Sequence, residues 1–149
     1  MYGANEQEVE EYLVEFTWMP QTVNLKLKAT SINGVADKLE QIGKELDKLI
    51  LQKPSYKKYL NENLLTFKWR DEEELTHISK NAFGNAIDIN TKYCDYWLED
   101  KKRELVYKEY KNQVPKEIVK IFEKYGFIWG GAWNKYQTCH FEYRPELLF

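Results

Sequence analysis

Two short segments of the chain carry side chains that could bind a metal ion or transfer a proton. The first covers residues 79–88 and ends at Asp88, and the second covers residues 137–143 and contains His140. A carboxylate and an imidazole are both common zinc ligands. Each residue also has an ordinary alternative: Asp88 could simply end a strand, and a single histidine is more often a hydrogen-bonded core residue. The surrounding spacing therefore decides which interpretation is better.

That spacing resembles the D-alanyl-D-alanine carboxypeptidase family, which includes VanY-type and phage endolysin peptidases. The family has a first motif S-x-H-x-x-G-x-A-x-D and later an acidic residue, two further residues and a histidine. The chain matches at Ser79, Gly84, Ala86, Asp88, His140, Phe141 and Glu142. The resemblance also includes residues 18–20, 32–35, 88–93 and 141–147, so it covers nearly the whole chain.

The resemblance implies an α+β fold: a single LAS-type zinc peptidase domain with helices packed on a small antiparallel sheet. In the family, zinc is held by the histidine and aspartate of the first motif and by the histidine of the second. This implies that Asp88 and His140 are metal ligands, with Gly84 and Ala86 where the chain passes close to the metal. An upstream arginine stabilises the oxyanion or the substrate carboxylate, and Arg70 is the matching candidate.

Two positions depart from the family pattern. Asn81 stands where the family has its first zinc histidine, and Gln137 stands where it has the general base. An amide oxygen is a poor substitute for imidazole, and a catalytic zinc usually needs three protein ligands. The amide of Gln137 cannot act as a base, a role typically worth about 10²–10⁴ in rate. The sequence therefore predicts weak or absent zinc binding. The sequence alone does not distinguish natural loss of the two family residues from their deliberate replacement by Asn81 and Gln137.

Three functions remain open at this point. The first is a degenerate family member that recognises a peptidoglycan stem peptide or muropeptide, with zinc hydrolysis lost or strongly reduced. The second is an active zinc D,D- or L,D-carboxypeptidase or endopeptidase with a rearranged site, in which His77 or a water molecule replaces the lost ligand beside Asp88 and His140. The third is a binding or structural domain that keeps only the fold.

Aromatic residues cluster around the second motif. Trp129, Trp133 and Tyr136 could belong to the core or could line a groove for a glycan or stem peptide. We assign Trp133 and Tyr136, together with Ser79 of the first motif, to substrate binding. This assignment gives the candidate site an aromatic wall beside its polar residues.

The chain has two cysteines, Cys94 and Cys139, which are too few for a disulfide framework. We expect both thiols to be unpaired. Cys139 directly precedes His140, and neighbouring residues on a strand point to opposite faces. Cys139 is therefore expected to be a buried structural thiol that faces away from any metal.

The local patterns predict elements that would position these residues. Apolar residues recur every three or four positions over residues 35–51, which is typical of an amphipathic helix, with Ser31 or Asn33 as its cap. A second helix is expected over residues 115–125, followed by Gly126. Strands, or an extended segment in the first case, are expected over the following ranges: 12–19, 64–70, 86–89 and 139–143. The 149 residues suit one domain, with residues 1–20 as an extended N-terminal arm.

Composition excludes some classes of partner. The net charge of -2 leaves no broad basic field for nucleic acid. No apolar run approaches the roughly 20 residues of a membrane span. The first residues lack the basic and apolar regions of a signal peptide, so none is expected in this chain. The family resemblance nevertheless implies an extracytoplasmic location, in the periplasm or cell wall.

Overall fold

A computed structural model of the chain describes residues 2–67, 84–96, 111–133 and 136–148. The N-terminal part contains α1 (Glu6–Glu11), β1 (Leu13–Trp18), β2 (Leu25–Thr30) and α2 (Val35–Gln52). The C-terminal part contains β3 (Ala86–Asp88), α4 (Lys116–Lys124), β4 (Phe127–Trp129) and β5 (His140–Tyr143). Short 3-10 helices lie between several of these elements. In the described part of the chain, no helix is long and apolar enough to cross a membrane.

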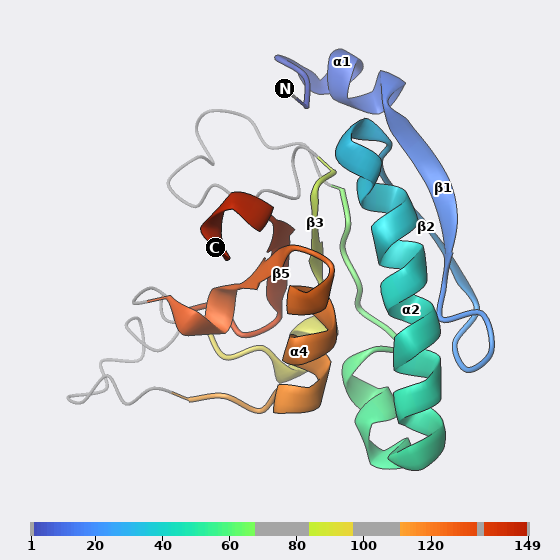
Figure 1. The fold of residues 1–149 in the computed structure, drawn as a ribbon, viewed down its shortest axis with the longest axis vertical. Helices are drawn as coiled ribbons and strands as arrows, with labels where there is room; N and C mark the ends of the chain where they lie inside the picture. The colour runs from blue at the N-terminus through green and yellow to red at the C-terminus, as the bar shows by residue number, and fades with distance from the viewer. Residues whose placement is uncertain (1, 68–83, 97–110, 134–135, 149) are drawn as a thin grey trace.

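The strands form two antiparallel sheets. β1 and β2 make a hairpin in which Leu13 pairs with Thr30. The second sheet has the order β3-β5-β4. Figure 1 shows α2 between the hairpin and the elements around the second sheet. Helices combined with small antiparallel sheets in one small domain confirm the predicted α+β class.

Each long helix packs mainly on a different sheet, which corrects the expectation that both would cover one sheet. α2 packs on the hairpin strands, whereas α4 contacts β4. The Phe122 ring of α4 stacks on Phe141 of β5 with centroids 3.9 Å apart, and the Trp18 ring lies 6.3 Å from that of Phe122. The expectation was wrong because β2 was not recognised in the sequence, although its alternating Leu and Lys residues are typical of a strand.

The hairpin loop is fixed by a buried carboxylate on α2. Asp47 is 2% exposed and accepts hydrogen bonds from the backbone N–H of Gln21 (3.1 Å) and from the backbone N–H (3.1 Å) and hydroxyl (2.6 Å) of Thr22. One turn earlier, a Cβ on Gly43 would lie 2.8 Å from the backbone nitrogen of Met19. Gly43 therefore allows the backbone of the loop to lie close to α2, and the carboxylate of Asp47 holds the loop there by hydrogen bonds.

The predicted helix over residues 35–51 is confirmed by α2, and Lys53 follows its last residue. The predicted caps were wrong. A 3-10 helix, Ile32–Gly34, leads into α2, and Gly34 occupies the N-cap position in the left-handed region at φ 69° with no side-chain cap. The chain thus enters α2 through glycine backbone geometry. The helix predicted over 115–125 is confirmed by α4, which starts directly after Pro115.

The strand predictions are confirmed for β3 and β5 and in part elsewhere. Residues 13–18 form β1, so the N-terminal extended segment is one strand of a hairpin preceded by α1. Of the segment 64–70, Leu65 makes an isolated antiparallel bridge with Asp88. Residues 68–70 lie outside the described residues.

Gly84, which was expected where the chain passes close to the metal, packs against Leu13 and Thr30 of the hairpin. It has φ 70°, and a Cβ on it would lie 2.7 Å from Cδ2 of Leu13. Its carbonyl accepts a hydrogen bond from the N–H of Thr30 at 2.9 Å. The glycine thus lets the end of the hairpin approach the start of β3, which places the second sheet against the first.

We predict that Asp47→Ala lowers the free energy of unfolding by roughly 2–4 kcal/mol, because three donors lose a charged acceptor in a buried position. Denaturant unfolding measures the change. Asp37→Ala, an exposed carboxylate on the same helix, is the matched control and should cost under about 1 kcal/mol. Equal losses in the two variants would contradict the role given to Asp47.

Candidate functional site

Asp88 and His140 meet on neighbouring strands of the second sheet. The register of β3 and β5 places Asp88 opposite His140 and Ala86 opposite Glu142. Directly opposed residues share one face of a sheet. His140 Nδ1 lies 2.7 Å from Asp88 Oδ1, and His140 Nε2 lies 3.1 Å from Glu142 Oε1. The imidazole therefore lies between two carboxylates.

All three side chains of this cluster are buried: Asp88 is 5%, His140 1% and Glu142 4% exposed. Asp88 is also fixed through its backbone, because its N–H donates to Leu65 O at 2.8 Å and its carbonyl accepts from Leu65 N at 3.0 Å. The second oxygen of Glu142 lies 3.5 Å from Nη1 of the half-exposed Arg144. The cluster thus extends from the buried imidazole to the surface.

The surroundings of His140 favour its protonated form. Burial alone lowers the pKa of His140, but the hydrogen bonds that the imidazole donates to Asp88 and Glu142, and the charges of these carboxylates, raise that pKa to about 9. At neutral pH the imidazole then carries a proton on each nitrogen, and each proton has a carboxylate acceptor. A buried charge is tolerated in this way only when it is paired.

The side chains of the cluster are of the types that bind zinc. Asp88 Oδ1 and His140 Nδ1 face each other, and Glu142 occupies the other nitrogen in the manner of a carboxylate that orients a metal-bound histidine. A catalytic zinc needs three protein ligands. Across the described ranges, no group of three His, Cys, Asp or Glu side chains is placed to hold a metal ion. The described donors therefore do not complete a catalytic zinc site.

Several predicted site residues lie outside the described residues. These are Asn81 at the position of the first zinc histidine, His77 as its possible replacement, Arg70 as the electrostatic stabiliser and Ser79 as a substrate-binding residue. Their assignments stay predictions. For Asn81, the sequence gives its place in the motif and its amide side chain.

Gln137, at the position of the general base, is set beside His140 by a tight turn. Its backbone N–H donates to Gly130 O at 3.1 Å, and its carbonyl accepts from the N–H of His140 at 3.2 Å. A Cβ on Gly130 would lie 2.5 Å from that carbonyl oxygen. The turn therefore requires glycine at position 130.

The two aromatic candidates differ in exposure. Trp133 is 36% exposed, and its ring centroid lies 5.6 Å from that of His140. Tyr136 is only 5% exposed. Trp133 thus offers accessible aromatic surface at the cluster, whereas most of Tyr136 is enclosed by protein.

Glu142 was matched to the family motif in the sequence but was given no role. The signal for its role was present, because it lies two residues after His140 and so on the same face of a strand. Its contact with His140 Nε2 makes it the second carboxylate of the cluster.

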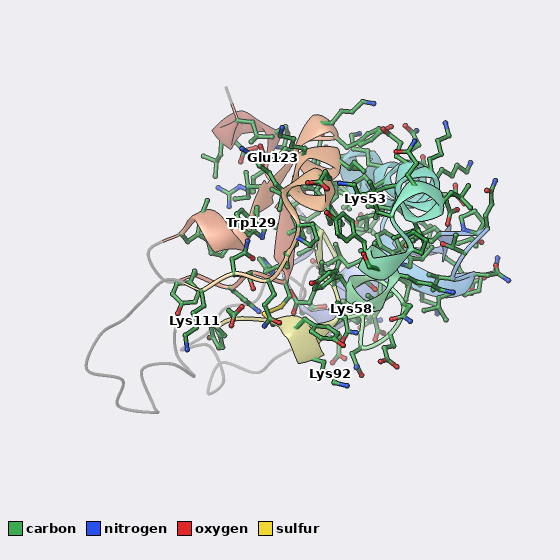
Figure 2. The ribbon with its side chains drawn as sticks, turned by 90° about the horizontal axis from the view of Figure 1, so that it is seen from below. Lys53, Lys58, Lys92, Lys111, Glu123 and Trp129 are labelled. Atoms are coloured by element: carbon green, nitrogen blue, oxygen red, sulfur yellow. A yellow bond between two sulfur atoms is a disulfide. The ribbon has the colours of Figure 1, made fainter. Side chains whose placement is uncertain are left out.

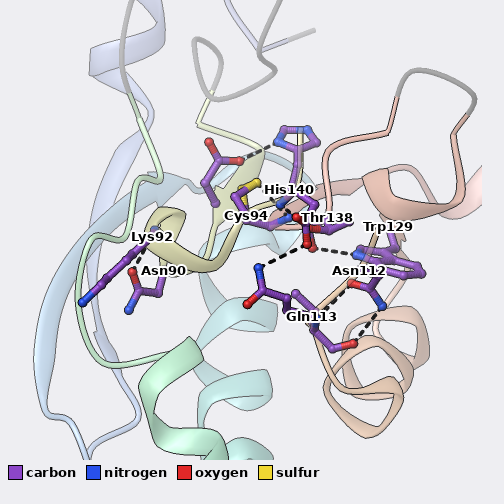
Figure 3. The surroundings of a disulfide bond; sticks show 12 residues. Asn90, Lys92, Cys94, Asn112, Gln113, Trp129, Thr138 and His140 are labelled. Atoms are coloured by element: carbon purple, nitrogen blue, oxygen red, sulfur yellow. Dashed lines mark hydrogen bonds and ion pairs between the residues drawn. A yellow bond between two sulfur atoms is a disulfide. The ribbon is translucent and has the colours of Figure 1, made fainter. Parts of the chain in front are cut away.

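The prediction that the two cysteines are unpaired was wrong, because Cys94 and Cys139 form a disulfide with their Cα atoms 5.0 Å apart. The segment after β3 runs antiparallel to the segment before β5. Thr138 N donates to Asp95 O at 3.1 Å, and Asp95 N donates to the Thr138 hydroxyl at 2.9 Å. This alignment brings the two cysteines together directly beside His140 (Figure 3).

For the metal-free protein, we predict that the His140 imidazole titrates with a pKa near 9. Because this value lies above the ordinary value of about 6.5, the stability from the cluster is complete below pH ~6.5 and is lost as pH rises through 9. NMR titration in the presence of a chelator measures the pKa, and His77→Gln assigns the signals of the two histidines. Glu142→Gln should lower the pKa. Titration of His140 near 6.5 would contradict the cluster.

Replacing both cysteines, as Cys94→Ser with Cys139→Ser, is expected to destabilise the protein. The disulfide spans 45 residues, and loop-closure entropy for that length corresponds to roughly 4 kcal/mol. Denaturant unfolding of the double variant tests the size of the loss. Alkylation of both thiols in the folded, unreduced protein would show that the bond is absent.

Comparison with known proteins agrees with the geometry of the site. A family model described as D-alanyl-D-alanine carboxypeptidase matches residues 73–143, a range that contains both motifs and therefore Asp88, Gln137 and His140. No curated protein and no solved structure matches the chain. The match confirms, over residues 73–143, the resemblance of this chain to the D-alanyl-D-alanine carboxypeptidase family.

Proposed function

We propose that the chain is a peptidase-family domain that recognises peptidoglycan stem peptides and has lost most or all zinc-dependent hydrolysis. The observation that carries the proposal is the position of Gln137. Its backbone carbonyl accepts a hydrogen bond from the N–H of His140, three residues later, and this closeness to the Asp88–His140 pair supports Gln137 as the general-base position. The residue at that position is an amide, which does not titrate near neutral pH and cannot act as a general base.

Among the described residues, the three side chains of the cluster do not replace the missing base. Both nitrogens of His140 contact carboxylates, so neither has a free lone pair with which to take a proton from water. Asp88 and Glu142 are occupied by the same contacts and are buried. The cluster therefore links β3 to β5 through its ion pairs. None of its three side chains is arranged to activate a nucleophile.

Recognition requires less of the site than hydrolysis does. Trp133 supplies a partly exposed ring beside His140, and an aromatic surface next to fixed polar groups is the usual composition of a small-molecule site. In the family, bound zinc would polarise the scissile carbonyl and acidify water. Here Asp88 and His140 would be two of its ligands, and Asn81 would have to be the third.

The disulfide supports an extracytoplasmic location for this function. Disulfides persist in oxidising compartments such as the periplasm and the cell surface, and they are rare in the cytosol. The Cys94–Cys139 bond lies beside the cluster, so reducing conditions would act on the candidate site itself. A periplasmic or cell-wall location would also give access to peptidoglycan.

We predict that Asn81→His tightens zinc binding by about 10²–10³-fold, since one ligand of a zinc site is worth roughly 3–4 kcal/mol. Calorimetric titration of the chelator-treated protein with zinc measures the change, with His140→Gln in the same background as the control that should abolish it. Tight binding by the unaltered chain that disappears in His77→Ala would instead support the rival function, an active enzyme with a rearranged site.

Restoring both family residues should restore hydrolysis. We expect Gln137→Glu alone to have little effect, because a base without zinc-activated water has no good nucleophile. The double variant Asn81→His with Gln137→Glu should cleave a muropeptide, and the effects should be strongly non-additive because both residues act on one water. Arg70→Ala should then lower turnover. Mass spectrometry with a chelator control detects the products. An inert zinc-loaded double variant would favour a purely binding or structural domain.

A further inference from the structure

A cavity of about 370 Å³ lies beside α4, and its lining includes Val114, Lys116, Val119, Lys120, Glu123 and Trp129. Its volume falls within the usual range of small-molecule sites, about 300–1,000 Å³. Figure 2 labels two of these lining residues, Glu123 on α4 and Trp129 at the end of β4. None of the lining residues belongs to the Asp88–His140 cluster.

The cavity and the cluster lie on opposite faces of β5. His140 and Glu142 point to one face, so Phe141 between them points to the other. That second face is covered by α4, because Phe141 stacks on Phe122 of this helix. Trp129 pairs with Phe141 across β4 and β5 and therefore shares its face.

The aromatic and aliphatic residues of the cavity are held by contacts within the protein. The indole N–H of Trp129 donates to Thr138 O at 2.8 Å, so its polar atom is satisfied within the protein. A Cβ on Gly131 would lie only 2.1 Å from the indole ring, which shows that glycine backbone lies against it. Val114 and Val119 are buried beside the cavity at 4% exposure each. The cavity thus combines a fixed aromatic ring with two aliphatic side chains.

The charged residues at the cavity are exposed and, within the described residues, have no ion-pair partner. These are Lys116, Lys120 and Glu123. Other charges on α4 are paired: Glu117 contacts Lys53 at 2.8 Å, and Lys124 contacts Glu45 at 3.0 Å. The charges on the side of α4 that faces α2 and Lys53 are therefore paired. Within the described ranges, the charges on the side that faces the cavity are not.

The two lysines also occupy positions that local helix energetics disfavour. Lys116 is the first residue of α4, where the helix dipole disfavours a cation. Lys120 follows at i+4, where like charges repel. A bound anion near the two lysines would offset both effects, which favours a ligand that carries a negative charge.

We propose that this cavity binds a sugar ring that carries a carboxylate. The apolar C–H face of the ring would pack on Trp129 and the two valines, Lys116 and Lys120 would bind the carboxylate, and Glu123 would accept hydrogen bonds from hydroxyl groups. This proposal goes beyond stem-peptide recognition, because it adds a glycan contact on the face of β5 opposite His140. A domain with both sites would contact the sugar and the peptide of one polymer.

The test compares N-acetylmuramic acid, which carries a lactyl carboxylate, with N-acetylglucosamine, which lacks it. Each is titrated to millimolar concentrations into the full chain, followed by amide and indole NMR signals. We expect N-acetylmuramic acid to shift the Trp129 indole N–H and the amides of α4, with N-acetylglucosamine at least about tenfold weaker. The double variant Lys116→Ala with Lys120→Ala should remove this preference.

The matched control is Lys44→Ala with Lys48→Ala, another exposed i,i+4 lysine pair, on α2. It should leave binding unchanged. The proposal is overturned if neither sugar binds, if both bind equally, or if the Lys116 and Lys120 variant keeps the preference. A sugar-free stem peptide, followed through the Trp133 and His140 signals, tests the proposed function separately, so failure of one site is distinguishable from failure of the other.

Discussion

The contact between His140 Nδ1 and Asp88 Oδ1, at 2.7 Å across neighbouring strands, is the interaction on which the rest of the site depends. It exists because the β3–β5 register places the two residues opposite each other. Glu142 then reaches the second imidazole nitrogen from the same strand face. A different register would separate these side chains and turn half of them toward α4.

The remaining elements hold this register in place. The Phe122–Phe141 stack presses α4 onto one face of β5, and the Leu65 bridge holds the outer side of Asp88. The Cys94–Cys139 bond fixes the chain directly before His140. With both sides of the sheet restrained, the buried imidazole and its two carboxylates form a charge network that Arg144 extends toward the surface. Both imidazole nitrogens are engaged in this network.

Sequence alone predicted the two longer helices and the Asp88–His140 pair because these follow local rules, whereas α1 was not predicted. α2 and α4 repeat apolar residues every three or four positions, and the spacing of the two motifs identified Asp88 and His140. The disulfide could not be predicted from the two cysteines, because their pairing depends on how segments 45 residues apart align. The predicted caps of α2 were wrong for a related reason. The N-cap is Gly34, whose left-handed backbone conformation starts the helix, and a search for capping side chains does not detect it.

The central claim is that the scaffold of a zinc peptidase persists here without its hydrolytic chemistry. The most direct test incubates the unaltered chain with a muropeptide at saturating zinc and follows the substrate by mass spectrometry. The account predicts that the peptide stays intact while its binding shifts the signals of Trp133. Release of a D-amino acid or a shortened stem peptide, blocked by a chelator and absent in His140→Gln, would contradict it.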